Sequence, residues 1–279
     1  MQHKPIEILV TNDDGYTSKG INFLANILEE YGNVTIVAPN EVQSGMSAAL
    51  SMGKTIRMTK KSEHTGTHGH NITVYALTGT PVDCVKMAMN KLFKVGGSQT
   101  VTPDPTDRGY KPHIVFSGIN HGSNASIASL YSGTLGAAAE GAIYGVKSVG
   151  LSINTHHPNP DFTQIEKHLK HIVHKAINSP MEEGIYLNVN FPDIAADQIK
   201  GIRITKQGNG MWHKEFEQRE DPHGRDYYWM TGNFKDLEPQ ESNQGDHKLM
   251  DMGYITIVPH KTDTTCYATM EKMAKEWNL

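Results

Sequence analysis

The feature that most constrains the fold of this chain is a short apolar run that ends abruptly in acidic and turn-forming residues. Ile8, Leu9 and Val10 run directly into Thr11-Asn12-Asp13-Asp14-Gly15. An apolar run of this length, bounded by turn residues, predicts a buried strand that ends at a tight turn. An amphipathic segment follows at 18–31, so the strand is expected to open an α/β unit.

Asp13 and Asp14 form a pair of adjacent carboxylates at this strand end. Open α/β sheets bind their ligands outside the carboxyl ends of the strands. Two neighbouring carboxylates repel each other unless a positive charge lies between them, and a hard divalent cation with oxygen ligands is the simplest candidate. The alternative is an ordinary turn, because Asn, Asp and Gly are the usual turn residues. The later strand ends decide between the two readings.

The remaining pattern predicts an α/β fold with a Rossmann-like, mostly parallel sheet flanked by helices. Strands at 6–11 and 34–38 enclose the helix at 18–31, and such a βαβ unit makes the two strands parallel neighbours. A β-hairpin is predicted within 53–78, where a loop at 62–71 is expected to be disordered.

Strands and helices then continue to the C-terminus. The predicted helices are 81–93, 125–146, 162–178 and 266–277, and the predicted strands are 113–116, 148–153, 186–192, 202–205 and 251–259. The helix at 125–146 is unusually rich in Gly, Ala and Ser. Since glycine weakens a helix, this composition predicts that a strand or a bound anion approaches its backbone closely.

Two segments differ in amino-acid composition from the predicted core. Residues 95–112 are rich in Gly, Pro, Thr and Asp and are expected to be a surface insertion. Residues 208–248 are charged, aromatic and turn-rich, which favours an extended hairpin or arm for oligomer contacts over a capping subdomain with its own core. We therefore expect a core at 1–155 that carries the site, and at 156–279 the remaining elements with the arm and a C-terminal helix.

Composition limits the partners and the compartment. The formal net charge of the 279-residue chain is -4, so nucleic acid is not an expected partner. No apolar run reaches the length of a membrane span, and no secretory signal is visible, so no membrane partner is expected. Cys84 and Cys266 are far apart and form no ligand pair, which favours a reducing cytoplasm.

Three polar strand ends converge in the predicted sheet. Asn12–Gly15 follows the first strand, Ser44-Gly45 follows the second, and Ser117–Asn120 follows the strand at 113–116. They supply carboxylate, hydroxyl and amide oxygens, which suit a hard divalent cation with positions left for water or phosphate. Glycines let backbone N–H groups face an anion. This combination predicts hydrolysis of a phosphoryl group.

Other chemistries fit the sequence poorly. The chain has no Gly-x-x-x-x-Gly-Lys-Ser/Thr loop, no His-Glu-x-x-His and no Gly-x-Ser-x-Gly. The histidines at 64, 68 and 70 and those at 168, 171 and 174 lack a carboxylate or cysteine at a ligand spacing, so we expect neither group to bind a metal.

Segments spread over nearly the whole chain, in a characteristic order, resemble one known family. They are Asn12-Asp13-Asp14-Gly15, Ala38-Pro39 with Gln43-Ser44-Gly45, Gly79-Thr80-Pro81-Val82-Asp83-Cys84-Val85, Ser117-Gly118-Ile119-Asn120-His121-Gly122-Ser123-Asn124, Tyr131-Ser132-Gly133-Thr134, Ala138-Ala139-Glu140-Gly141, Asn188-Val189-Asn190-Phe191-Pro192, Asp221-Pro222-His223-Gly224-Arg225 and Gly253-Tyr254-Ile255-Thr256-Ile257. Together they resemble the SurE (survival protein E) family of metal-dependent 5'-nucleotidases, which are phosphoric monoester hydrolases.

The resemblance implies a metal site and a reaction. The metal ligands of the family correspond to Asp13, Asp14, Ser44 and Asn120. The implied cofactor is one divalent ion per subunit, Mg or Mn. The implied reaction is the hydrolysis of nucleoside 5'-monophosphates to nucleoside and phosphate, and some members also act on 3'-nucleotides or short polyphosphate. The implied assembly is a homodimer or tetramer in which the C-terminal part exchanges elements between subunits.

Within that reading we assign two further sets of residues. Asp13 and Asp14 are the predicted catalytic residues, and the attacking group is either a water activated by the ion or a carboxylate, with Asp14 as the candidate. The predicted phosphate- or substrate-binding residues are Asn12, Gly45, Asn124, Ser132, Gly133 and Thr134.

Two alternative functions remain at this stage. One is a non-catalytic protein that binds a nucleotide or a metal, and the other is a different metal-dependent hydrolase on the same fold. The final strand ends Val258-Pro259-His260-Lys261, where the family more often has a Thr-Pro-Leu-like ending. This departure leaves the predicted metal ligands intact and bears on base preference and assembly.

Overall fold

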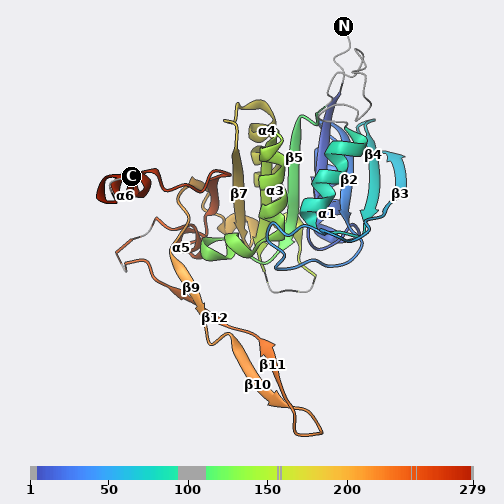
Figure 1. Cartoon of the computed structure of the whole chain (residues 1–279). Helices are drawn as coiled ribbons and strands as arrows, with labels where there is room; N and C mark the ends of the chain where they lie inside the picture. Colours follow the sequence, from blue (N-terminus) through green and yellow to red (C-terminus); the bar gives the residue numbers. More distant parts are fainter. Residues whose placement is uncertain are drawn as a thin grey trace.

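The centre of the molecule is a nine-stranded sheet (Figure 1). The structure is a computed structural model that describes residues 5–93, 111–155, 157, 159–239, 241–242 and 244–277. In spatial order the strands are β3 (Met58–Thr65), β4 (Asn71–Leu77), β2 (Gly32–Pro39), β1 (Ile6–Thr11), β5 (Ile114–His121), β6 (Lys147–Asn154), β7 (Ile185–Pro192), β13 (Ile255–Lys261) and β8 (Ile202–Ile204).

The middle of this sheet is parallel, and the exceptions lie toward its two edges. Each neighbouring pair from β4 through β2, β1, β5 and β6 to β7 is parallel. β3 runs antiparallel to β4, β13 runs antiparallel to β7, and β8 is parallel to β13. The predicted mostly parallel α/β fold is confirmed. β1 lies between β2 and β5, so the carboxyl ends of these three strands lie side by side at the same end of the sheet.

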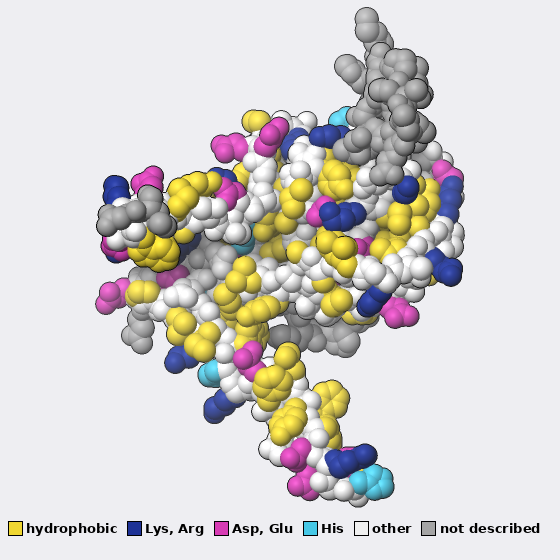
Figure 2. All heavy atoms as spheres, viewed as in Figure 1, with side chains coloured by type: hydrophobic (Ala, Val, Ile, Leu, Met, Phe, Trp, Pro, Cys, Tyr) yellow, Lys and Arg dark blue, Asp and Glu magenta, His cyan; other side chains and the backbone are white. Residues whose placement is uncertain are grey.

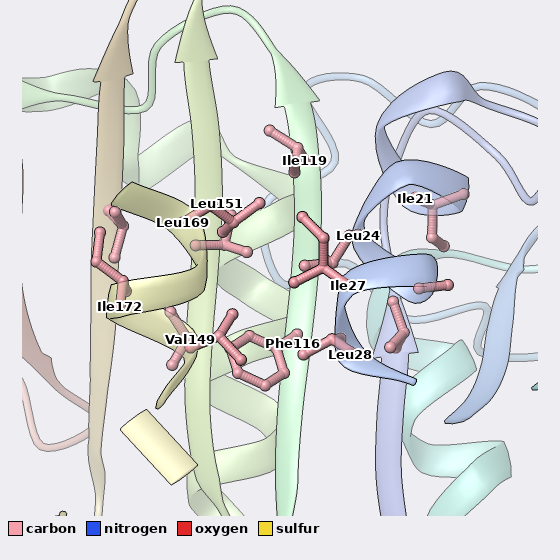
Figure 3. Close-up of a cluster of buried hydrophobic side chains, with 14 of the residues drawn as sticks. Ile21, Leu24, Ile27, Leu28, Phe116, Ile119, Val149, Leu151, Leu169 and Ile172 are labelled. Carbon is pink, nitrogen blue, oxygen red and sulfur yellow. The ribbon is translucent and has the colours of Figure 1, made fainter. Parts of the chain in front are cut away.

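Helices cover both faces of the sheet, as predicted. α1 (Lys19–Leu28) and α4 (Glu166–Asn178) pack on one face. α2 (Pro81–Met87) and α3 (Gly133–Ile143) pack on the other. Figure 3 shows the apolar side chains of α1 and α4 gathered over β5 and β6. Burial of apolar area from water is the main favourable term for this arrangement.

The segment at 125–146 is not one continuous helix, so that expectation is wrong. A 3₁₀ helix spans Ser126–Tyr131, and α3 begins after Ser132. The hydroxyl of Ser132 accepts a hydrogen bond from the amide of Leu135 at 3.1 Å, which caps the new helix. The predicted close approach to its small residues is confirmed, because a Cβ on Gly141 would lie 2.3 Å from the Ser148 hydroxyl oxygen.

The histidine-bearing loop is ordered and not disordered as expected. β3 continues to Thr65, and the tip of the hairpin closes on Glu29, the residue that ends α1. The Glu29 carboxylate is almost fully buried and accepts the backbone N–H groups of His68 at 2.9 Å and His70 at 3.0 Å. Nδ1 of His68 is 2.9 Å from the same carboxylate. One buried acid therefore holds this loop.

The segment at 208–248 forms the predicted arm. β9 (Gly210–His213) pairs with β12 (Asn233–Asp236), and β10 (Phe216–Glu220) pairs with β11 (Asp226–Met230). Figure 1 shows these two-stranded ribbons extending away from the sheet. α5 (Asp246–Asp251) then leads back to β13, and the predicted C-terminal helix is α6 (Tyr267–Glu276).

Three sequence expectations concern organisation. The expected domain division at 155–156 falls between β6 and β7, which are neighbours in one sheet, and it stays a prediction. The expected insertion at 95–112 lies almost entirely outside the described residues. In the part of the chain that the structure describes, no helix has the length and apolar character needed to span a membrane.

Glu29 provides a test of this architecture through Glu29→Gln. The substitution points an amide N–H₂ group at buried backbone donors, so we expect the free energy of unfolding to fall by about 1–3 kcal/mol at pH 7. Burial raises the pKa of the Glu29 carboxyl, but hydrogen bonds from His68 and His70 outweigh it and the net pKa is lowered. The stabilisation is therefore present above the ordinary carboxyl pKa and is lost as the pH falls through the lowered value.

The measurement is urea denaturation of both proteins from pH 7 downward. The difference between them should shrink with acid. Glu183→Gln, at an exposed position, is the matched control and should match the parent protein at every pH. An equal difference at pH 7 and at acid pH would show that the Glu29 charge does not hold the loop.

Candidate active site

The carboxyl ends of β1, β2 and β5 surround a small polar cavity of about 240 Å³, which we call the Asp13 cavity. It brings together three of the four predicted metal ligands, namely Asp13, Ser44 and Asn120. Its lining residues are Asp13, Ser44, Gly45, Asn120, His121, Gly122, Ser123, Asn124, Ala128, Tyr131, Ser132 and Trp212.

Asp13 is buried, at 4% exposure, and is held from two sides. The hydroxyl of Thr134 donates a 2.7 Å hydrogen bond to its Oδ1, and the amide of Gln43 donates to its main-chain oxygen, also at 2.7 Å. Burial, and to a smaller extent the Asp14 charge, raise the pKa of Asp13 to about 6, against the lowering effect of the Thr134 hydrogen bond. A negative charge at this position thus needs compensation that the protein only partly supplies.

Asp14, the fourth predicted ligand, lies beside the cavity and contacts His121. The amide of His121 donates to Oδ2 of Asp14 at 3.3 Å, and Nδ1 of the same histidine is 3.9 Å from that oxygen. Burial raises the pKa of Asp14, and the amide and charge of His121 oppose this effect. β5 therefore positions the second carboxylate, although the carboxylate belongs to the turn after β1.

Asn12, predicted as a substrate ligand, is fully buried and builds the turn instead. Its Oδ1 accepts the amide of Gly15 at 3.1 Å, and its Nδ2 donates to the Gly15 carbonyl at 3.0 Å and to the Ser18 hydroxyl at 2.8 Å. Both early readings of this stretch are therefore compatible, because the turn is what aims the acids.

The loop after β2 carries Ser44 and Gly45 and rests on the segment before α3. The amide and hydroxyl of Ser47 donate to the carbonyl oxygens of Tyr131, at 3.1 Å, and Leu130, at 2.7 Å. A Cβ on Gly136 would lie 2.2 Å from the Ser47 carbonyl oxygen, so only glycine permits this approach. The absence of a side chain at Gly136 thus allows the loop that carries Ser44 to pack closely against α3.

Asn120 belongs to β5 and does not follow it, because the strand runs five residues beyond its predicted end at 116. The register with β6 shifts between Ser117 and Asn120. Nδ2 of Asn120 donates to the Gly122 carbonyl at 2.9 Å, which leaves its carbonyl oxygen for another partner. The irregular end of the strand therefore presents an oxygen to the cavity.

Of the predicted phosphate-binding residues, Gly45, Asn124 and Ser132 line the cavity. Asn124 is fixed by buried polar groups. Its side-chain Nδ2 donates to the Ser152 hydroxyl at 2.8 Å, and its backbone N–H donates to Oδ1 of Asn190 at 2.8 Å. Gly133 and Thr134 lie outside the lining, next to Asp13. Thr134 donates a hydrogen bond to the Asp13 carboxylate, and a Cβ on Gly133 would lie 3.2 Å from the Asp13 Cβ.

Six lining residues had been given no site role from the sequence, namely His121, Gly122, Ser123, Ala128, Tyr131 and Trp212. His121 directly follows Asn120, and that adjacency was the available signal. Its buried Nε2 has no hydrogen-bond partner within the described part of the chain. Trp212 lies far along the chain in β9, and no local pattern connects it to the site.

The donor set fits a hard divalent cation. Two carboxylates, a hydroxyl and an amide offer oxygen atoms only, which suit Mg²⁺ or Mn²⁺ better than a soft metal. Among the described residues that line the cavity there is no Lys or Arg to neutralise the acids. Anywhere in the described part of the chain, no group of three or more His, Cys, Asp or Glu side chains is placed so that it could hold a metal ion. A cation here would therefore rely on the neutral oxygens as well as on the two carboxylates.

Known proteins match this chain over nearly its whole length. The family model described as "Survival protein SurE" matches residues 8–214. The chain is 38% identical over 276 residues to "5'-nucleotidase SurE" of Cytophaga hutchinsonii, which covers 99% of this chain and 98% of that protein. It is 35% identical over 279 residues to the Bacteroides fragilis protein of the same name, with both chains fully covered.

A solved structure is similar throughout. It is titled "Crystal Structure of Sure Protein from Aquifex aeolicus" and superposes with a TM-score of 0.75 at 32% identity. The match covers 96% of this chain and 98% of that chain. The similarity therefore includes elements of the sheet that lie late in the sequence.

Gly136→Ala tests the link between α3 and the Ser44 loop. In an ordinary helix this change stabilises by about 0.5–1 kcal/mol. Here the new methyl group would meet the Ser47 carbonyl, so we expect the opposite sign, a loss of about 1–3 kcal/mol, together with weaker Mn²⁺ binding. Chemical denaturation and calorimetric titration with Mn²⁺ measure the two effects.

Ala139→Gly in the same helix is the matched control. It should lose only the ordinary 0.5–1 kcal/mol or so and should bind Mn²⁺ like the parent protein. A Gly136→Ala variant that is more stable than the parent would contradict the close approach.

Proposed function

The chain belongs to the SurE family, and on that premise we propose that it is a divalent-metal-dependent phosphomonoesterase that hydrolyses nucleoside 5'-monophosphates to nucleoside and phosphate. The observation that carries the proposal is the Asp13 cavity. It combines oxygen donors from three strand ends with no Lys or Arg among its described lining residues. Its support from relatives is the name 5'-nucleotidase SurE, borne by proteins that match essentially the whole chain.

We assign the metal-binding role to Asp13, Asp14, Ser44 and Asn120. A single Mg²⁺ or Mn²⁺ ion held there would polarise a phosphate oxygen and offset its negative charge. Thr134 keeps the Asp13 carboxylate in place, and the His121 amide does the same for Asp14. Support for this assignment comes from the raised pKa values of both acids, because burial disfavours their charged forms and a bound cation would stabilise them.

We assign phosphate binding to the polar groups on the other side of the cavity. Gly45, Asn124 and Ser132 line it. Hydrogen bonds with Ser152 and Leu135 fix Asn124 and Ser132, and Gly45 has a positive φ. None of these features involves the two acids. Pre-organised donors of this kind cost no reorganisation when the charge on a transferring phosphoryl group develops. Asn12, Gly133 and Thr134 act indirectly, by holding the turn and Asp13.

We propose a cytoplasmic location for the enzyme. Both cysteines are free, and Cys266 is exposed, which suits a reducing compartment.

We also propose that the arm joins subunits in a homodimer or tetramer. Its outer ribbon exposes large apolar side chains, including Phe216, Trp229 and Met230. Figure 2 shows apolar atoms along the arm. Exposed aromatic and Met side chains are typical of interface surfaces, and a thin ribbon cannot bury them against itself.

Asp13→Asn tests the catalytic proposal. We expect phosphate release from AMP and GMP with Mg²⁺ or Mn²⁺ to fall by about 100-fold or more, because a charged ligand is lost, while the fold persists. EDTA should abolish release by the parent protein. The measurement is inorganic phosphate, with circular dichroism as the check on folding.

Asp197→Asn removes a charge outside the site and serves as the control. Near-normal turnover by Asp13→Asn with metal present would show that the ligand assignment is wrong. A folded parent protein that binds AMP but releases neither phosphate, base nor nucleotide under any metal would move the function to a non-catalytic binding protein.

The paired change Trp229→Ser and Met230→Ser tests the arm. Removal of apolar surface from the outer ribbon should shift the protein to a smaller species in sedimentation velocity, with the core still folded. Met52→Ser is the control, since Met52 is a similarly exposed methionine outside the arm. An unchanged sedimentation coefficient in the double variant would assign subunit contacts to another surface.

A further inference from the structure

Two buried asparagines of β7 lie next to Asn124, which lines the Asp13 cavity. Asn188 and Asn190 are both fully buried, and their side chains share one face of the sheet because they are two residues apart in a strand. Asparagine is mostly an exposed residue, and a buried amide is nearly always hydrogen-bonded. The partners of these two side chains therefore indicate what they do.

The shared partner of the two asparagines is the backbone of Asn124. The Asn124 N–H donates to Oδ1 of Asn190 at 2.8 Å, and Nδ2 of Asn190 donates to Oδ1 of Asn188 at 2.9 Å. Nδ2 of Asn188 then donates to the Asn124 carbonyl oxygen at 2.9 Å, which closes a ring of three hydrogen bonds. We call these three residues the asparagine ring. Two side-chain amides thus satisfy both backbone groups of one residue.

Asn124 needs these partners because it belongs to no helix or strand. It lies between β5, which ends at His121, and the 3₁₀ helix that begins at Ser126. Asn124 is buried, and a buried backbone N–H or C=O group without a hydrogen bond is costly. The two asparagines supply here the bonds that a neighbouring strand supplies within a sheet.

The asparagine ring permits only one orientation of each amide. It starts and ends at backbone groups, of which the N–H can only donate and the C=O can only accept. Rotation of either side-chain amide by half a turn would bring two donors or two acceptors face to face. The orientations of Asn188 and Asn190 are therefore fixed, and so is the backbone of Asn124 that they hold.

Two further contacts use bonding capacity that the ring leaves free. The Ser123 hydroxyl donates to Oδ1 of Asn190 at 3.3 Å, and Nδ2 of Asn188 lies 3.5 Å from Nε2 of His260. An amide oxygen accepts two hydrogen bonds and an amide nitrogen donates two, so neither contact displaces a bond of the ring.

The fixed backbone of Asn124 positions a side chain that lines the Asp13 cavity. Its Nδ2 carries two N–H groups, and the fully buried hydroxyl of Ser152 accepts one of them at 2.8 Å. The other N–H is a candidate donor to a bound anion. A donor that is already held in place binds a phosphate oxygen without reorganisation.

We propose that Asn188 and Asn190 are positioning residues for phosphate binding, which act through the Asn124 backbone to hold its side-chain amide at the Asp13 cavity. The proposal rests on the proposed function, which assigns Asn124 to the phosphate side of that cavity. Neither β7 asparagine lines the cavity, so both act without contact with the substrate. None of the four proposed metal ligands takes part in the ring.

Asn190→Asp makes the direction of the ring testable with pH. An ionised carboxylate has no donor and would place an oxygen against Oδ1 of Asn188, whereas the protonated acid carries one O–H and restores the ring. We expect the affinity for phosphate, divided by that of the parent protein at the same pH, to be near one in acid. It should fall by about 5- to 100-fold as the pH rises and the new acid ionises, because a buried group then lacks its partner.

The measurement is calorimetric titration with inorganic phosphate in the presence of Mg²⁺, from about pH 5 to about pH 9, a range that spans the ionisation of a buried carboxyl. Asn178→Asp is the matched control, since it makes the same change at an exposed position at the end of α4. Its affinity for phosphate should equal that of the parent protein at every pH.

The double variant Asn188→Leu/Asn190→Leu removes the ring without adding a charge. We expect it to bind phosphate about 5- to 100-fold more weakly at every pH, with no recovery in acid, and to raise KM for AMP by a similar factor. Hydrogen exchange in the segment that carries Asn124, measured without metal or phosphate, should become faster. The affinity for Mn²⁺ should stay at the parent value in both ring variants, with circular dichroism as the check on folding.

The outcomes are distinct. A pH-independent ratio in Asn190→Asp, unchanged hydrogen exchange in the double variant, or equal losses of Mn²⁺ and phosphate affinity would overturn the positioning role. Normal hydrolysis of AMP by both ring variants at every pH would also overturn it and leave the proposed function standing. Phosphate binding that changes as expected, with no phosphate released from any ester, would support the positioning role and overturn the proposed reaction.

Discussion

The placement of a carboxylate in the interior, at the carboxyl end of a central strand, is the constraint on which the site depends. Burial disfavours the charged form of Asp13, and each group around it limits this cost in a different way. Thr134 donates a hydrogen bond from α3, and the loop after β2 donates an amide to its main chain. The neighbouring strand end brings neutral oxygens. The parallel sheet is what makes these contributions converge, since it aligns the ends of β1, β2 and β5.

The sequence predicted the parts of this arrangement that depend on local chemistry. The run from Ile8 to Gly15 implied a buried strand and a turn, and the structure has both. The helix predicted to begin at 81 does so in α2, where Thr80 and Asp83 form a capping box. Because parallel strands align their carboxyl ends, the sequence alone predicts that the polar residues after three strands lie together. The metal-binding role of those residues stays a proposal.

What the sequence did not predict depends on contacts between distant segments. The extension of β5 to His121 follows from pairing with β6, and nothing in the local pattern marks it. The break at Ser132 was hidden because small residues suit a helix, a cap and a close approach equally well. The loop at 62–71 was expected to be disordered from its composition, yet the buried carboxylate of Glu29 orders it. Trp212 reaches the site from an arm whose own sequence indicates only exposed ribbons.

The arm has a consequence for how proteins of this type can diverge. One continuous segment carries Trp212 at its base and Trp229 near its outer end. A change that lengthens, twists or shortens the ribbon therefore alters the wall of the Asp13 cavity and the exposed apolar surface in a single step. The shape of the cavity and the apolar surface of the arm therefore change together, so selection on one of them restricts the changes that are accepted in the other. Diversification of the Asp13 cavity in such a lineage is expected to proceed through single substitutions on β9, which leave the length of the ribbon unchanged.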